Sequence, residues 1–278
     1  MRTVVHLSDL HFGTVRQEIV LPLLSLLERI RPNLIAVSGD LTQRARKEQF
    51  VAAREFLDAM PFSKIVVPGN HDIPLFNLFA RFAKKLDRYR RYISDDLNPF
   101  YSDPEIAVLG VNTARSATFK GGRVNSQQVA HMQERLGPRK GVTKIVVTHH
   151  PFDLPDAYPD KALVGRARMA MQQLASSGID LFLAGHLHIG LSEPTALRFQ
   201  ISGRSALMIQ AGTALSSRVR GEANSLNVIR IQHPNISVSR LAWRADLKVF
   251  VSTQADYFRH TETGWERGSK LDFAEPEE

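Results

Sequence analysis

Short apolar runs alternate with segments of helical periodicity in the first part of the chain. The runs at 3–7, 33–37 and 64–67 are typical of buried strands. Between them, residues 18–30 and 45–60 carry apolar side chains three or four positions apart, which predicts a helix in each segment. This β-α-β-α-β order predicts parallel strands joined by right-handed crossovers.

A second set of strands follows later in the chain. Apolar runs at 106–111, 144–147 and 179–183 predict three strands, and residues 126–136 and 166–177 predict helices between them. Beyond residue 190, short β-favouring runs predict a mostly antiparallel second sheet, at 206–209, 226–231, 236–241 and 247–251. No internal repeat or low-complexity linker divides the chain. We therefore expect one domain over residues 1–253 and a peripheral tail over residues 254–278.

Residues 74–99 interrupt this order. Apolar residues recur every three or four positions, which predicts a helix, and the opposite face is strongly basic. One interpretation is an ordinary amphipathic helix with a solvated face. The other is a basic lid over a site, because the segment directly follows His71 and Asp72. The lid hypothesis makes Arg88 and Arg91 candidate substrate contacts.

Polar side chains capable of binding a metal come directly after five of the predicted strands. In an open α/β sheet the carboxyl ends of the strands share one edge, where ligands bind. Clustered imidazoles and carboxylates are unfavourable unless a charged group holds them, and two divalent cations would do so. His6 lies within the first strand and is expected to be structural. The residues after the strands are Asp9, His11, Asp40, Asn70, His71, Asp72, His149, His150, His186 and His188.

The residue types narrow the choice of metal. The 278-residue chain contains no cysteine, which excludes thiolate zinc sites, disulfides and cysteine nucleophiles. Carboxylates and imidazoles favour manganese, iron, zinc or cobalt over a calcium cage. The pairs Asp9/His11 and His186/His188 are two residues apart, so extended backbone would direct both side chains of a pair to one face. Asp40 is the candidate for a carboxylate that bridges two metals.

Composition and charge restrict the function less. A hydrophobic fraction of 43% suits an ordinary globular protein. The net charge of +8 favours anionic partners such as phosphate esters, nucleic acid or an acidic membrane surface, but it fits a basic solvated surface equally well. The chain enters a strand at once, without a charged and apolar leader, and no run has transmembrane length. We therefore expect a cytoplasmic protein.

The ordered set of five motifs resembles the calcineurin-like metallophosphoesterase superfamily. The motifs cover residues 1 to about 190. The residues around Asp9 and Asp40 are most similar to those of the bacterial class III cyclic-nucleotide phosphodiesterase branch. The resemblance implies two packed mixed β-sheets flanked by helices, a four-layer α/β/β/α sandwich. The motifs are Asp9-x-His11, Gly39-Asp40, Gly69-Asn70-His71-Asp72, His149-x-Pro151 and Gly185-His186-x-His188.

The resemblance also implies a role for each site residue. One metal is held by Asp9, His11 and His188, the other by Asn70, His149 and His186, and Asp40 bridges them. The family motif has its histidine two residues before proline, so His149 is the expected ligand. His150 then becomes a pocket residue, and Asn112 is a further candidate substrate contact.

His71 is expected beside the second metal without binding it. There it could protonate the leaving oxygen or stabilise negative charge, and Asp72 could orient its ring. Asp72 could also cap a helix after Pro74.

These roles predict a dinuclear metal-dependent phosphohydrolase. Its two ions would be manganese, iron or zinc, and the resemblance implies attack of a metal-bridging hydroxide on phosphorus. The favoured substrate is a cyclic nucleotide or a similar phosphodiester. Alternatives are a nucleotide-sugar lipid pyrophosphatase of the lipid A pathway type, a nuclease, or a non-catalytic scaffold that keeps only the fold. A homodimer is a further hypothesis.

Overall fold

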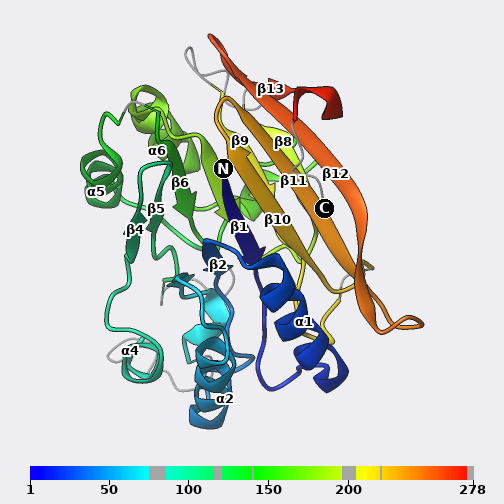
Figure 1. Ribbon diagram of the computed structural model, residues 1–278. Coiled ribbons are helices and arrows are strands. Elements are labelled where there is room, and N and C mark those ends of the chain that lie inside the picture. Colours follow the sequence, from blue (N-terminus) through cyan, green and yellow to red (C-terminus); the bar gives the residue numbers. More distant parts are fainter. Residues whose placement is uncertain (75–85, 116–120, 140, 196–204, 220, 274–278) are drawn as a thin grey trace.

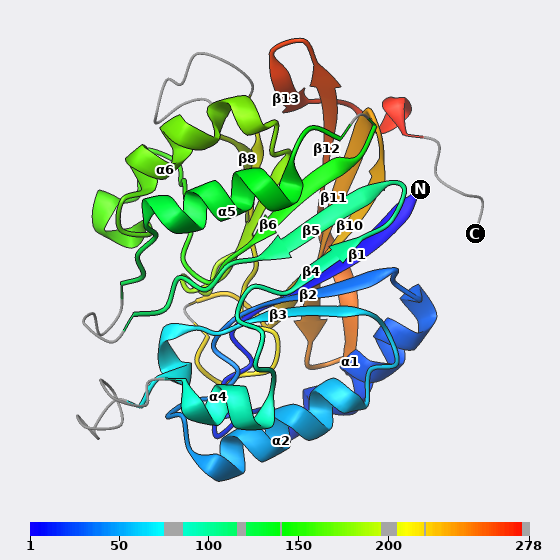
Figure 2. The ribbon, with the colours of Figure 1, turned by 90° about the vertical axis from the view of Figure 1, so that its left-hand side faces the viewer.

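Two β-sheets lie face to face in the middle of the molecule, with helices on both outer sides (Figures 1 and 2). Figure 2 shows α5 and α6 over one sheet and α1, α2 and α4 over the other. The computed structural model describes residues 1–74, 86–115, 121–139, 141–195, 205–219 and 221–273. The layers confirm the predicted α/β/β/α sandwich.

The first sheet has seven strands in the order β13-β12-β11-β10-β1-β2-β3. Strands β1, β2 and β3 are parallel to one another, and the remaining pairs are antiparallel. The strands are β1 (Arg2–Leu7), β2 (Leu34–Ser38), β3 (Lys64–Val67), β10 (Ser225–Gln232), β11 (Asn235–Arg244), β12 (Val249–Thr261) and β13 (Gly264–Arg267).

The second sheet has six strands in the order β4-β5-β6-β7-β9-β8. Its four central strands are parallel, and β4 and β8 pair antiparallel at the two edges. The strands are β4 (Phe100–Ser102), β5 (Ile106–Gly110), β6 (Thr143–Val147), β7 (Leu181–Ala184), β8 (Leu191–Pro194) and β9 (Leu207–Gln210).

Continuous apolar runs form these central strands because both of their faces are buried. In β2, Leu34 and Ala36 point into the core between the two sheets, whereas Ile35 and Val37 point toward the helices. A third core lies between the six-stranded sheet and helices α5 and α6. The helices are α1 (Gln17–Ile30), α2 (Lys47–Asp58), α4 (Asp87–Tyr92), α5 (Ser126–Leu136) and α6 (Ala167–Leu174), with short 3-10 turns η1 (Asn70–Asp72), η2 (Asp160–Ala162), η3 (Ala175–Ser177) and η4 (Lys270–Asp272).

The predicted boundary after residue 253 is wrong. It falls inside β12, and the chain continues through β13 as part of the seven-stranded sheet. Trp265 is 1% exposed in the core between the sheets, where its Nε1 donates to Asp180 Oδ1 at 3.0 Å. Mixed aromatic and charged residues resemble a tail in the sequence because β12 and β13 lie at the sheet edge and bury only some of their side chains.

The interruption at 74–99 is only partly described. Residues 75–85 of the predicted lid lie outside the described residues. The predicted helix does not reach residue 99, because α4 ends at Tyr92. Tyr89 is fully buried and its hydroxyl donates to the Val66 carbonyl at 2.9 Å. This part of the segment is therefore packed on the core beside β3.

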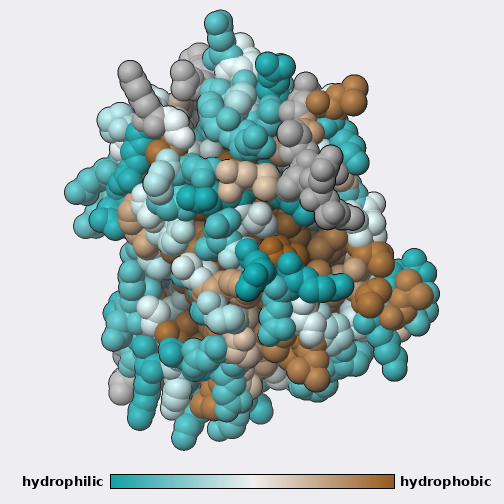
Figure 3. All heavy atoms as spheres, in the orientation of Figure 1, coloured by the Kyte–Doolittle hydropathy of each residue, from teal (hydrophilic) through white to brown (hydrophobic). Residues whose placement is uncertain are grey.

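The surface is mostly hydrophilic on the face shown in Figure 3. Apolar side chains are exposed near the turn between β11 and β12, at Leu247 and Val249. Within the described part of the chain, no helix is long and apolar enough to cross a membrane.

Candidate metal centre

The five polar strand ends meet, but they come from two sheets. Asp9, Asp40 and Asn70 follow β1, β2 and β3 of the seven-stranded sheet. His149 and His186 follow β6 and β7 of the six-stranded sheet. The single shared sheet edge that the sequence suggested is therefore replaced by two edges. Face-to-face packing of the sheets brings them together.

The predicted extended backbone at these positions is wrong. All four residues of the pairs Asp9/His11 and His186/His188 have a positive φ, and so does the candidate bridging residue Asp40. The values are 51° for Asp9, 49° for His11, 52° for Asp40, 73° for His186 and 60° for His188. Left-handed backbone at a non-glycine residue costs on the order of 1–3 kcal/mol. Strained residues of this kind cluster at functional sites, where the surrounding structure holds them in place.

The first group of ligand candidates comprises Asp9, His11 and His188. His188 Nε2 lies 3.1 Å from Asp9 Oδ1 and 3.2 Å from His11 Nε2. All three residues are buried. Their ligand atoms converge closely enough to bind one cation.

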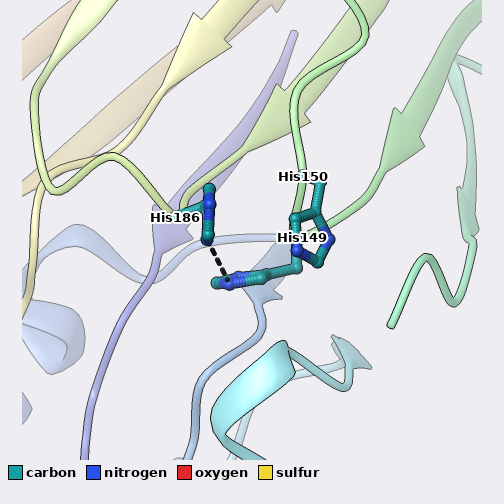
Figure 4. Close-up of side chains that lie close together, drawn as sticks. All are labelled: His149, His150 and His186. Atoms are coloured by element: carbon teal, nitrogen blue, oxygen red, sulfur yellow. Dashed lines mark hydrogen bonds between the residues drawn. The ribbon is translucent and has the colours of Figure 1, made fainter. Parts of the chain in front are cut away.

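The second group comprises Asn70, His149 and His186. His149 Nε2 lies 3.1 Å from Asn70 Oδ1 and 3.3 Å from His186 Nδ1. Figure 4 shows the rings of His149 and His186 turned toward each other, with the dashed line joining these two nitrogen atoms. The arrangement offers one amide oxygen and two imidazole nitrogens to a second cation.

Asp40 lies between the two groups. Its Oδ2 is 3.8 Å from His11 Nε2 and 3.4 Å from His149 Nε2. Burial disfavours a charged Asp40, yet His149 and His11 outweigh it and hold the pKa of this carboxyl well below its usual range. Burial alone would lower the pKa of His149, but Asp40 raises it to about 9. In the absence of a metal the site thus favours an ionised Asp40 beside a protonated His149, and a bound cation would replace that proton.

Backbone carbonyls fix which histidine nitrogen faces the site. His149 Nδ1 donates to the Ser38 carbonyl at 2.8 Å, and His188 Nδ1 donates to the Arg218 carbonyl at 2.8 Å. Each neutral ring then presents a bare Nε2, the form that binds a metal.

The surroundings of one Asp9 carboxylate oxygen also indicate a metal site. Asp9 Oδ1 is buried, and among the described residues no hydrogen-bond donor reaches it. A bare imidazole nitrogen of His188 facing this oxygen at 3.1 Å is unfavourable unless a cation lies near both. The donor set therefore fits metal ions.

The predicted role of Asp72 is not what the structure shows. Its carboxylate accepts from the backbone N–H groups of Leu41, Thr42 and Gly69 and from the Thr42 hydroxyl, at 2.8–3.1 Å. Burial, and then repulsion from Asp40, raise the pKa of Asp72 to about 6. Asp72 thus joins the loop after β2 to the loop after β3. The Gln43 carbonyl, rather than Asp72, orients the ring of His71, whose Nδ1 donates to it at 2.9 Å.

His71 lies beside the first ligand group, not the second as expected. Its ring meets the His11 ring edge-on, with 5.0 Å between the centroids. Arg218 Nη1 donates to His71 Nε2 at 3.2 Å and to Gln43 Oε1 at 3.2 Å. Sequence analysis missed Arg218, which follows β9 in a segment with no motif, so no local signal marks it.

Glycine is required at position 69 for space rather than for a left-handed turn. The backbone of Gly69 has φ −103° and ψ −175°, which any residue can adopt. A Cβ added at this position would overlap Asp40 Oδ1 and the Asp40 backbone nitrogen. The close approach holds the Asn70 loop against the Asp40 carboxylate.

The four candidate substrate contacts lie in different places. The rings of His149 and His186 lie 4.8 and 4.6 Å from that of His150, whose Nδ1 lies 2.9 Å from Thr113 Oγ1. Asn112 accepts from the Ala114 backbone within its own loop. Arg88 donates to the Ala45 carbonyl at 2.7 Å, and Arg91 lies over the ring of Tyr92. The described contacts therefore bring only His150 into the metal centre.

The fold and the site together define a metallophosphoesterase. Residues 2–190 match the model of the calcineurin-like phosphoesterase family. The chain belongs to this family and is a phosphoesterase.

Named relatives include two bacterial enzymes. The chain is 26% identical over 203 residues to the glycerophosphodiester phosphodiesterase GpdQ of Enterobacter lignolyticus, covering 66% of this chain and 70% of that protein. It is 20% identical over 200 residues to a probable cyclic nucleotide phosphodiesterase of Synechococcus sp., covering 67% and 73%.

Solved structures share the fold at low identity. A dimetal phosphatase from Danio rerio superposes with a TM-score of 0.64 at 14% identity, covering 90% of this chain and 98% of that one. Purple acid phosphatase PPD1 from yellow lupin gives a TM-score of 0.64 at 12% identity, covering 90% and 52%.

Proposed function

We propose that this protein is a phosphodiesterase that hydrolyses its substrate with two metal ions. The observation that carries the proposal is Asp40, whose Oδ2 lies between His11 Nε2 and His149 Nε2. A carboxylate shared by two converging ligand groups is the arrangement that a dinuclear site needs. Asp9, His11 and His188 would hold one ion, and Asn70, His149 and His186 the other.

Two bound ions would supply a water activated at neutral pH and positive charge for the phosphoryl oxygens. Manganese, iron and zinc all suit the oxygen and nitrogen donors. The remaining catalysis comes from positioning and from fixed charge near the transferred group. These are tasks for the side chains that surround the metal ligands.

Arg218 is well placed to supply that fixed charge. Its guanidinium reaches the ring of His71 at 3.2 Å, next to His11, while its own carbonyl accepts from the ligand His188. Burial lowers the pKa of His71, and its Nδ1 proton is held by the Gln43 carbonyl. His71 then accepts from Arg218 through Nε2. We favour charge stabilisation by this pair over proton donation by His71 alone.

A diester substrate is supported by the two relatives named above, which are called a glycerophosphodiester phosphodiesterase and a probable cyclic nucleotide phosphodiesterase. We favour a cyclic nucleotide or a similar small phosphodiester. A nucleotide-sugar lipid pyrophosphatase and a nuclease remain the alternatives to test. A non-catalytic scaffold is disfavoured, because every expected metal ligand is present in the sequence.

The test uses Asp40→Ala with bis-p-nitrophenyl phosphate as substrate. The protein is stripped of metal, reloaded with manganese, iron or zinc, and its metal content is measured together with turnover. Wild type should bind two equivalents, and the variant should lose both ions and nearly all activity. Asp58→Ala, which removes an exposed carboxylate paired with Arg54, is the matched control. Turnover like that of wild type in Asp40→Ala would refute the proposal.

A substrate panel then separates the alternatives. It contains cAMP, a glycerophosphodiester, a UDP-diacylated sugar and single-stranded DNA. A cyclic nucleotide or glycerophosphodiester should give the highest kcat/KM if the proposed substrate class is right. Preference for the lipid anhydride or for DNA would select the corresponding alternative instead.

A further inference from the structure

A cavity is formed by two loops at the carboxyl ends of strands of the six-stranded sheet. It has a volume of about 380 Å³ and lies between the segment after β5 and the segment after β6. This volume is within the range of small-molecule sites. Its lining includes Gly121, Gly122, Lys161, Val164, Gly165 and Arg166. Both segments leave the carboxyl ends of parallel strands of the six-stranded sheet, and the segment after β6 also carries His149.

One imidazole ring separates this cavity from the metal ligands. The backbone of Gly122 packs directly on His150, and a Cβ at Gly122 would overlap the His150 Nδ1. The ring centroids of His150 and His186 lie 4.6 Å apart, and Figure 4 shows both residues near His149. The His150 ring therefore lies between the Gly122 wall of the cavity and the ligand candidate His186.

The backbone around the cavity is firmly held. Gly165 donates to the Gly122 carbonyl at 2.9 Å, and Val164 donates to the Pro151 carbonyl at 2.7 Å. These bonds tie the two segments together. Arg166, the next residue, has a left-handed backbone with φ 71°. Strain of this kind at a non-glycine residue is typical of ligand sites.

The cavity is cationic. Lys161, Arg166 and Arg168 all line it, against one acidic residue, Asp160. Burial, and then the guanidinium groups of Arg123 and Arg166, lower the pKa of the nearby Arg115. Positive charge is thus concentrated around this cavity.

We propose that this cavity binds a second phosphate group of the substrate, carried by the part of the diester that is not held by the metal ions. Lys161 and Arg166 would pair with that phosphate, and the backbone of Gly121 and Gly122 would leave room for it. Charged hydrogen bonds of this kind are roughly twice as strong as neutral ones. The inference rests on the proposed phosphodiesterase function and adds a preference, among small phosphodiesters, for those that carry a second phosphate.

The test compares two substrates that differ by one phosphate. Thymidine 5′-(p-nitrophenyl phosphate) and its 3′-phosphorylated derivative release the same chromophore from the same diester. We expect the derivative to have a KM about tenfold lower with wild type, a ratio that corresponds to about 1.4 kcal/mol. Arg166→Gln and Lys161→Gln should each remove most of this ratio. Both should leave kcat for the unphosphorylated substrate unchanged.

The matched control is Arg139→Gln, which removes an exposed guanidinium that donates to Ser102 Oγ and does not line the cavity. It should keep the tenfold ratio. Equal KM values for the two substrates with wild type would overturn the inference, as would a ratio that survives in both cavity variants.

A binding measurement separates this inference from the proposed function. Calorimetry with metal-loaded protein compares thymidine 3′,5′-bisphosphate with thymidine 5′-phosphate, and it requires no turnover. Tighter binding of the bisphosphate, lost in Arg166→Gln, supports the cavity even if neither ester is hydrolysed. Equal affinity of the two nucleotides refutes it even if both esters are good substrates. Thermal unfolding of each variant verifies that it is folded.

Discussion

Asp72 gives the sharpest test of how the metal centre is held together. The structure predicts that Asp72→Ala destabilises the fold, because its carboxylate accepts three buried backbone N–H groups, from Leu41, Thr42 and Gly69. A buried donor without an acceptor costs about 1–3 kcal/mol. The lower value applies here, since removing the charge also relieves repulsion from Asp40. We therefore expect a loss of about 3 kcal/mol in the free energy of unfolding.

Urea unfolding of the metal-free protein, followed by far-ultraviolet circular dichroism at pH 7.5, measures this loss without a contribution from metal binding. The control is Asp58→Ala, in which the removed carboxylate is exposed and paired with Arg54. This control should lie within about 0.5 kcal/mol of wild type. If Asp72→Ala were as stable as the control but lost activity, the reasoning would be refuted. Asp72 would then act in catalysis, as the sequence first suggested.

Three further predictions concern charge, pH and the end of the chain. Arg218→Gln should lower kcat/KM by at least tenfold, since a charged hydrogen bond contributes about 1.5–3 kcal/mol. The metal content of this variant should not change, because the group that accepts from His188 is the backbone carbonyl of residue 218. Steady-state kinetics and metal analysis test this prediction, and a loss of bound metal would contradict the role of the Arg218 guanidinium in charge stabilisation. Burial lowers the pKa of His6 to about 3, so the unfolded chain takes up a proton below pH 6.5 that the native state excludes. Wild type should therefore lose about 2 kcal/mol more stability than His6→Gln between pH 7 and pH 5, and equal losses in urea titrations at both pH values would contradict this. Trp265→Ala should cost about 3–5 kcal/mol, whereas Leu271→Ala, at a side chain 96% exposed, should leave the urea midpoint unchanged; a small effect at Trp265 would mean that β13 is peripheral after all.

Most of the fold could be predicted from local pattern. The central strands are buried on both faces, so they appear as continuous apolar runs, and β3 begins and ends at the predicted residues. The strands at the edges of the two sheets were harder to predict from the sequence. β4, β8 and β13 are three or four residues long, and only some of their side chains are buried, so they leave too weak a pattern to detect.

The long segment at 74–99 shows a different limit. Apolar spacing of three or four residues predicted one helix, but α4 is only six residues long and ends at Tyr92. Hydrophobic periodicity indicates which side chains face the core. It does not report where the backbone leaves the helix.

The sequence by itself determined the ligand set of the candidate site, because aspartate, asparagine and histidine directly after apolar strands are local features that keep their order in any packing. Only the tertiary structure decided how these residues are supported. Arg218 and His71 are 147 positions apart, and Asp72 accepts from residues 30 and 31 positions away. Such contacts depend on how the two sheets pack and where their loops meet. They follow no regular period or fixed spacing along the chain, so no pattern in the sequence predicts them.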